Sequence, residues 1–71
     1  MATMTFEVPT LADQNAAEEI TEEILVHESD AKVDVDLSAK TVNVETEASR
    51  ASIRQMIVAL GHTVEEEIIN N

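Results

Sequence analysis

The spacing of the apolar residues constrains this chain most, because it changes repeatedly between a two-residue and an approximately four-residue period. Met4, Phe6 and Val8 alternate with polar residues, which is the pattern of a strand with one buried face. Pro9 then ends the run, since it cannot continue a strand ladder. Over residues 13–27 the apolar side chains recur at helical spacing with glutamates between them. The first part of the chain therefore predicts a strand followed by an acidic amphipathic helix.

The middle of the chain predicts an antiparallel hairpin. Residues 31–37 and residues 41–46 both alternate between apolar and polar side chains, and the short segment 38–40 separates the two runs. Beyond the hairpin, an apolar stripe at helical spacing begins near Ser49, and Gly61 is well placed to end that helix in a left-handed conformation. The second half of the chain thus repeats the order of the first.

The complete order is strand, helix, strand, strand, helix and a short final strand over residues 62–65, which residues 66–71 extend or leave frayed. Two strand–helix–strand units with right-handed crossovers build a ferredoxin-like βαββαβ sandwich. We therefore predict an α+β fold with a four-stranded antiparallel sheet and both helices on one face. The clean alternation within each strand indicates that the other face of the sheet meets water. One domain over residues 1–71 accounts for the pattern, with its core over about 5–66.

Charge and cysteine content restrict the function. Fifteen acidic residues against four basic ones give a formal net charge of −11. Nucleic acids and anionic membranes need Lys or Arg to displace their counterions, so we expect neither as a partner. A basic protein surface suits the chain better, although an acidic surface also serves solubility alone. With no cysteine, the chain has neither disulfides nor thiolate ligands.

The sequence favours neither a membrane protein nor an enzyme. No apolar stretch approaches the length needed to cross a bilayer, and we expect a cytoplasmic protein. Candidates for proton transfer are two histidines and many solvated carboxylates, and there is no Cys or Tyr. A domain of this size also has little room for a substrate pocket. We therefore expect no enzymatic activity.

The segments 6–12, 33–44 and 53–65 carry a resemblance to a known family, and the more specific parts are the run Val-Asp-Val-Asp-Leu with its lysine turn and the final Gly-His-Thr-Val-Glu. Together they resemble the heavy-metal-associated domains, and within them the small copper chaperones of cyanobacterial type. The resemblance covers nearly the whole chain, from Thr5 to Glu66. It implies a ferredoxin-like fold and a protein of metal-ion binding and transport.

The chain departs from this family at the metal loop. Its members hold Cu(I) between two thiolates in a Met-x-Cys-x-x-Cys loop, because soft sulfur ligands suit that ion. In this sequence Leu11 stands for the methionine, Asp13 for the first cysteine and Ala16 for the second. His62 matches a loop residue that lies next to the metal site in the cyanobacterial-type chaperones. The resemblance therefore implies the scaffold of a metal carrier without its sulfur ligands.

Two interpretations of these positions remain open. Asp13 and His62 could supply an oxygen and a nitrogen ligand, which suit Zn(II), Ni(II) or Cu(II), but a tight site needs three or four protein ligands. Metal binding at Asp13, Ala16 and His62 would then be limited to weak Cu or Zn. Alternatively, Asp13 or Asn15 caps the first helix, and His62 is an ordinary loop residue.

Two functions follow from the sequence. The first is a heavy-metal-associated-domain protein of copper-chaperone type in which metal binding is weak or lost. The alternative is a metal-independent module that docks on a basic partner through the acidic first helix and the 8–16 loop. By family resemblance, that partner would be a domain of a metal-transporting ATPase. The residues assigned to docking are Leu11, Gln14, Asn15, Glu18, Glu19, Glu22 and Glu23.

Overall fold

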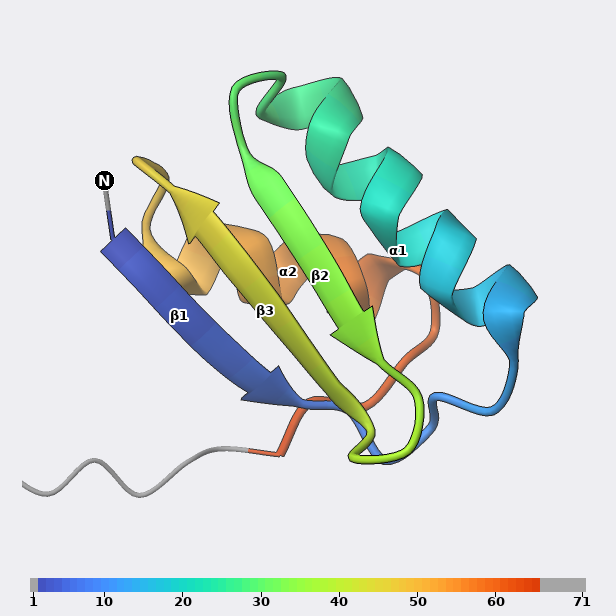
Figure 1. Cartoon of the computed structure of the whole chain (residues 1–71). Coiled ribbons are helices and arrows are strands. Elements are labelled where there is room, and N and C mark those ends of the chain that lie inside the picture. Colours follow the sequence, from blue (N-terminus) through green and yellow to red (C-terminus); the bar gives the residue numbers. More distant parts are fainter. Residues whose placement is uncertain (1, 66–71) are drawn as a thin grey trace, which may run out of the picture.

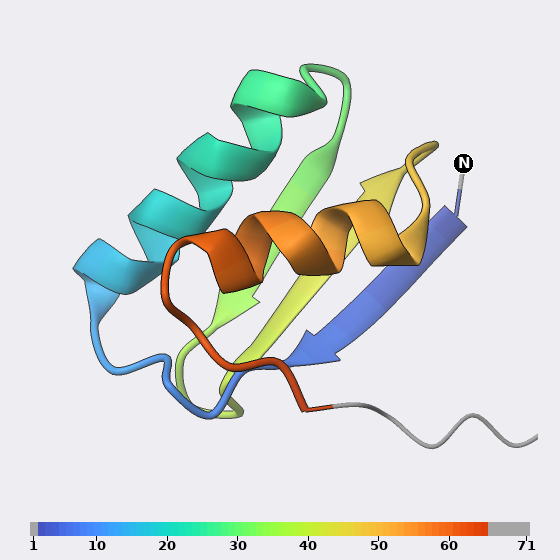
Figure 2. The ribbon, with the colours of Figure 1, turned by 180° about the vertical axis from the view of Figure 1, so that it is seen from behind.

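The computed structural model describes residues 2–65, and it shows two helices lying on one face of an antiparallel sheet (Figures 1 and 2). The strands follow the order β1-β3-β2 across the sheet. This arrangement confirms the α+β, ferredoxin-like fold. In chain order the elements are β1 (Ala2–Glu7), α1 (Gln14–His27), β2 (Lys32–Asp36), β3 (Thr41–Thr46) and α2 (Arg50–Ala59).

The predicted fourth strand is reduced to a single bridge within the described residues. Glu65 meets Glu7 in an isolated antiparallel bridge, and its N–H donates to the Glu7 carbonyl at 2.8 Å. β1 ends at Glu7, and just beyond it the N–H of Val8 still donates to the carbonyl of Lys40 at 2.8 Å, in the register of the β1–β3 pairing. The segment 62–65 therefore reaches β1 only at its last residue. The extension expected for residues 66–71 lies outside the described part of the chain.

Each helix begins at a side chain that accepts a hydrogen bond from a free backbone amide. The Asp13 carboxylate accepts from the Ala16 N–H at 3.0 Å, and the Ser49 hydroxyl accepts from the Ser52 N–H at 3.1 Å. Such N-caps satisfy donors that have no partner inside the helix. At the far end of α2, Gly61 adopts φ +95°, the left-handed conformation that favours glycine. Both helices therefore start and stop where local chemistry dictates.

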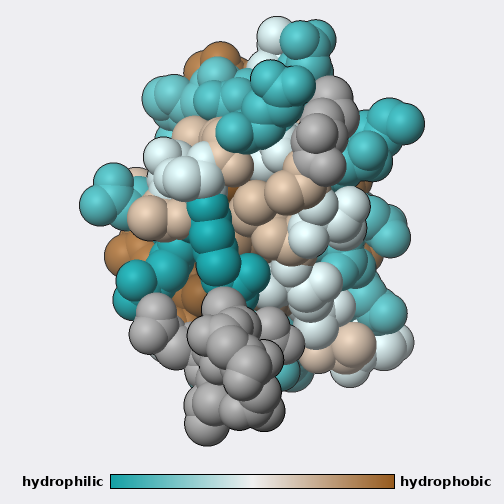
Figure 3. Space-filling view, turned by 90° about the vertical axis from the view of Figure 1, so that its left-hand side faces the viewer, coloured by the Kyte–Doolittle hydropathy of each residue, from teal (hydrophilic) through white to brown (hydrophobic). Residues whose placement is uncertain are grey.

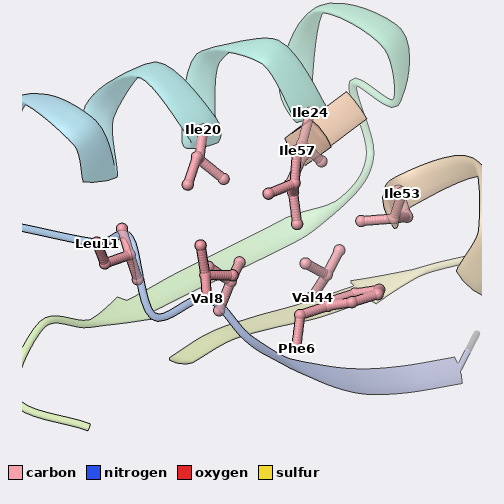
Figure 4. Close-up of a cluster of buried hydrophobic side chains, with 9 residues drawn as sticks. Phe6, Val8, Leu11, Ile20, Ile24, Val44, Ile53 and Ile57 are labelled. Atoms are coloured by element: carbon pink, nitrogen blue, oxygen red, sulfur yellow. The ribbon is translucent and has the colours of Figure 1, made fainter. Parts of the chain in front are cut away.

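A single apolar core fills the space between the sheet and the two helices. Figure 4 shows side chains from both helices pointing toward those of the strands and of the loop after β1. On the sheet, Phe6 and Val42 are cross-strand neighbours, and Val35 continues the same row. The fully buried members of the core are Phe6, Val8, Leu11, Ile20, Ile24, Val42, Val44, Ile53 and Ile57. These residues come from β1, the loop after it, β3 and both helices. Val33 and Val35 of β2 pack against them, so the core also reaches the edge strand.

The opposite face of the sheet is polar. The Thr5 hydroxyl donates to the Asn43 side-chain oxygen at 2.6 Å, and Asp34 is the next residue in the same row. Figure 3 views the molecule from the side at which β1 lies in Figure 1, and there teal and pale residues surround tan and brown areas. The alternation in the strands therefore separates a buried face from a wet one, as predicted. Within residues 2–65, neither helix is long and apolar enough to span a membrane.

The core predicts a clear difference between two neighbouring residues of α2. Ile57 is fully buried, whereas Val58 is 48% exposed. We expect Ile57→Ala to lower the free energy of unfolding by about 2–5 kcal/mol, because it removes buried methyl groups and leaves a cavity. Val58→Ala should change it by only about 0.5 kcal/mol. Urea unfolding followed by far-ultraviolet circular dichroism measures both, and equal losses would contradict this description of the core.

Candidate functional site

Two loops lie side by side at one end of the sheet. They are the segment 8–13 before α1 and the segment 61–65 after α2, drawn in blue and red in Figures 1 and 2. The Thr10 hydroxyl and the His62 Nδ1 are hydrogen-bonded at 2.8 Å, and the Thr63 N–H donates to the same hydroxyl at 3.1 Å. Thr10 therefore joins the two loops and places His62 beside the segment that corresponds to the metal loop.

The 8–13 segment is also anchored to the core and to the β2–β3 turn. The Leu11 side chain is fully buried in the core, and the Leu11 N–H donates to the Val8 carbonyl at 3.0 Å. From the β2–β3 turn, the Lys40 ammonium donates to the Leu11 carbonyl at 2.6 Å. A charge-assisted hydrogen bond of this kind is stronger than a neutral one. These contacts fix the shape of the loop.

Asp13 acts as the N-cap of α1. Its carboxylate accepts from the Ala16 N–H at 3.0 Å, while its own carbonyl accepts from the Ala17 N–H at 3.3 Å. A negative charge in this position is stabilised by the positive end of the helix dipole. Ala16 contributes its backbone amide to this cap, and its side chain is a methyl group with no ligand atom. Of the two interpretations of Asp13, the geometry supports the cap.

The donor atoms near the two loops do not fit a soft metal ion. Cu(I) selects thiolate and thioether sulfur, and the chain has no cysteine. Across residues 2–65, no group of three or more His, Asp or Glu side chains is arranged to hold a metal. Within the described residues the His62 ring makes one hydrogen bond, from Nδ1 to Thr10, and its Nε2 is the atom that could meet an ion. Weak Cu or Zn binding through Asp13 and His62 stays a prediction.

The acidic surface of α1 includes all but one of the residues that the sequence assigns to docking. Gln14, Asn15, Glu18, Glu19 and Glu22 are exposed, and Glu23 is partly buried. Glu23 pairs with His27, one helical turn later, at 3.1 Å. Leu11 does not belong to this surface, because its side chain is 0% exposed and packs in the core. The prediction that the Leu11 side chain contacts a docking partner was therefore wrong.

The structure adds an apolar part to this surface. A hollow of about 320 Å³ lies between α1 and the end of α2, lined by Glu19, Glu22, Glu23, Val26 and Leu60. Val26 is 77% exposed, the most exposed of the large hydrophobic side chains that the structure describes. In the sequence Val26 falls outside the apolar stripe of α1, which is the signal that could have identified it. The roles of Thr10 and Lys40 could not be seen in the sequence, because their hydrogen bonds join residues that are far apart in the chain.

The sequence profile of the heavy-metal-associated domain matches residues 5–63, which is most of the chain. The match includes the 8–13 segment with the cap at Asp13, and it ends within the second loop, at residue 63. No curated protein matches the sequence of this chain.

Solved structures with the same fold include copper chaperones of cyanobacteria. The copper chaperone Atx1 from Synechocystis PCC6803 is 32% identical, with a TM-score of 0.84, over 87% of this chain and 98% of its own. The solution structure of the cyanobacterial copper metallochaperone ScAtx1 is 33% identical, with a TM-score of 0.77, over 90% of this chain and 100% of its own. Atu1203 of Agrobacterium tumefaciens is 29% identical, with a TM-score of 0.80, over 87% of this chain and 97% of its own.

The role of Asp13 can be measured through stability. We expect Asp13→Ala to lower the free energy of unfolding by about 1 kcal/mol, because the Ala16 N–H loses its acceptor. Asp13→Asn keeps an acceptor oxygen and should lose much less. Urea unfolding of the three proteins gives the comparison. If both variants matched the original protein, the carboxylate would not be acting as a cap.

Proposed function

Because this chain belongs to the heavy-metal-associated domain family, we propose that it retains the family's scaffold for recognising a protein partner and does not bind soft metal ions tightly. The observation that carries this proposal is the hydrogen bond between the Asp13 carboxylate and the Ala16 N–H. At the two positions where the family places thiolates, the side chains are a helix cap and a methyl group. Hydrogen bonds from the Ala16 N–H to Asp13 and from Lys40 to the Leu11 carbonyl hold the loop.

The donor chemistry supports weak metal binding at most. An aspartate oxygen and an imidazole nitrogen suit Zn(II) or Cu(II), and two such ligands give a weak site. A metal would also compete with the Ala16 N–H for the carboxylate of Asp13 and with Thr10 for the ring of His62. We therefore propose that, when this domain meets a copper-carrying partner, the partner's own ligands hold the ion. Such a role requires no catalytic group.

The docking surface that we propose consists of the exposed acidic residues of α1 together with the hollow beside Val26. Its charge comes from glutamates, and the net charge of the chain is −11. A complementary partner presents Lys or Arg around an apolar side chain that can enter the hollow, since charge steers association and buried apolar contact adds affinity. Family resemblance supports a domain of a metal-transporting ATPase as this partner, and hence a cytoplasmic location.

Restoring the missing ligands tests the metal part of the proposal. We expect the double variant Asp13→Cys, Ala16→Cys to bind Cu(I) tightly, because both thiolates would sit at the N-terminus of α1, where the helix dipole favours their ionised form. The original protein should fail to take Cu(I) from a chelator that the double variant outcompetes. Competition under reducing, anaerobic conditions measures this.

The single variant Ala16→Cys is the matched control, because it has one thiolate and leaves the Asp13 cap in place. We expect its Cu(I) affinity to fall well below that of the double variant. Tight Cu(I) binding by the original protein would contradict the proposal. A folded double variant that fails to bind Cu(I) would show that the scaffold has lost more than its two cysteines.

Charge reversal tests the docking part. We expect Glu19→Lys, Glu23→Lys to weaken binding to a basic metal-binding domain of a metal-transporting ATPase by about tenfold at low salt. The matched control is Asp30→Lys, Glu47→Lys, which changes the net charge equally at a different hollow of the surface. Isothermal titration calorimetry at two salt concentrations measures the difference.

The control variant should bind nearly as well as the original protein, and added salt should reduce the gap between the two variants. If both double variants lost the same affinity, the effect would come from the net charge of the chain and not from the acidic surface of α1. Binding that ignores salt and both pairs of substitutions would exclude the acidic helix as the docking surface.

A further inference from the structure

A second groove lies on the other side of α1, between that helix and β2. Figure 1 shows α1 running alongside β2 at the border of the sheet. The groove has a volume of about 410 Å³. Its inner part includes Ala17 and Val35, which are small or medium-sized, so the helix and the strand do not fill the space between them. The complete lining is Gln14, Ala17, Glu18, Thr21, Glu22, Asp34 and Val35.

The strand beside this groove has an unpaired edge. The sheet order β1-β3-β2 places β2 at the border, and β3 pairs with one side of it only. In the part of the chain that the structure covers, no strand pairs with its outer side. Such an edge offers backbone N–H and C=O groups that an extended peptide can use as hydrogen-bond partners. An open edge next to a groove is the geometry by which a peptide adds to a sheet as a further strand.

The charges around the groove select the occupant. Glu18 and Glu22 stand on the helix side of the groove, and Asp34 stands on β2 in the polar row that it shares with Asn43. All three are exposed, and none makes a hydrogen bond or an ion pair that would neutralise it among residues 2–65. We propose that this groove binds an extended segment of a partner protein, with lysine or arginine at alternate positions, which adds to β2 as a strand.

The alternation follows from strand geometry. Successive side chains of an added strand point to opposite faces of the sheet, so every second residue would lie over the groove. Basic side chains on that side reach the carboxylates of Glu18 and Glu22, and the residues between them lie on the wet side. A second copy of this chain fits the edge poorly, since it would bring another net charge of −11 against the same carboxylates.

The groove and the docking surface proposed above share helix α1, and Glu22 lines both the groove and the hollow beside Val26. Glu18 lines the groove but not that hollow, whereas Glu19 and Glu23 line the hollow but not the groove. Substitution of Glu18 therefore tests the groove, and substitution of Glu19 is its control.

The experiment uses a short synthetic peptide with lysine at alternate positions and alanine or valine between them. In an amide NMR titration of the original protein, we expect saturable shifts concentrated in residues 14–22 and 32–36. Glu18→Lys should weaken binding of the peptide by about tenfold, and the control Glu19→Lys should leave its affinity within about twofold. A peptide with glutamate in place of lysine should not bind.

Backbone methylation separates strand addition from charge attraction. Two peptides carry N-methyl groups on alternate residues, one on the lysines and the other on the residues between them, so that each blocks the N–H groups of one side only. We expect their affinities to differ by about tenfold, because only one set of N–H groups faces β2. Equal affinities of the two methylated peptides would overturn the proposal. So would a dimer of the protein that the peptide dissociates, because that result would assign the edge to a second copy.

Discussion

The burial of isoleucine side chains from both helices against Phe6 and the valines of β3 is the interaction on which the rest of this structure depends. A chain of 71 residues without cysteine has no covalent crosslink to add to its core. Each fully buried side chain of this size contributes about 1.5–3 kcal/mol, which must offset the entropy lost on folding. Because Val8 and Leu11 belong to the same core, the loop between β1 and α1 is fixed by the forces that fold the domain. The metal loop of this family can therefore lose its ligands and keep its shape.

Hydrophobic periodicity was sufficient to predict the fold, because each strand has one wet face and each helix one buried stripe. The caps at Asp13 and Ser49 and the left-handed Gly61 could also be predicted, since they depend on neighbouring residues only. The reduction of the final strand over 62–65 to a single bridge could not, because it depends on how the segment after α2 approaches β1 in the folded domain.

The candidate site was less accessible to sequence reasoning. Alignment with the family motif placed Leu11 in the loop, and a loop position gives no periodicity from which its burial could be read. The contacts of Thr10 with His62 and of Lys40 with Leu11 join residues far apart in the sequence. The charge of α1 was evident from composition, but its division between two hollows depends on the packing of α2 and β2 against opposite sides of the helix. In physical terms, the charge attracts basic partners over a distance. The shapes of the two hollows determine which partner segments can then make close contact.

The N-cap at Asp13 also bears on how a loop of this kind could regain a metal in evolution. The cap uses the backbone N–H of residue 16, so a cysteine at position 16 leaves it intact. A cysteine at position 13 removes it, and the loss amounts to about 1 kcal/mol before any metal can repay it. The order of the two changes is therefore constrained, because only the path that begins at position 16 avoids a less stable intermediate. An aspartate that caps a helix at a position where the family has a cysteine thus opposes the change to cysteine at that position.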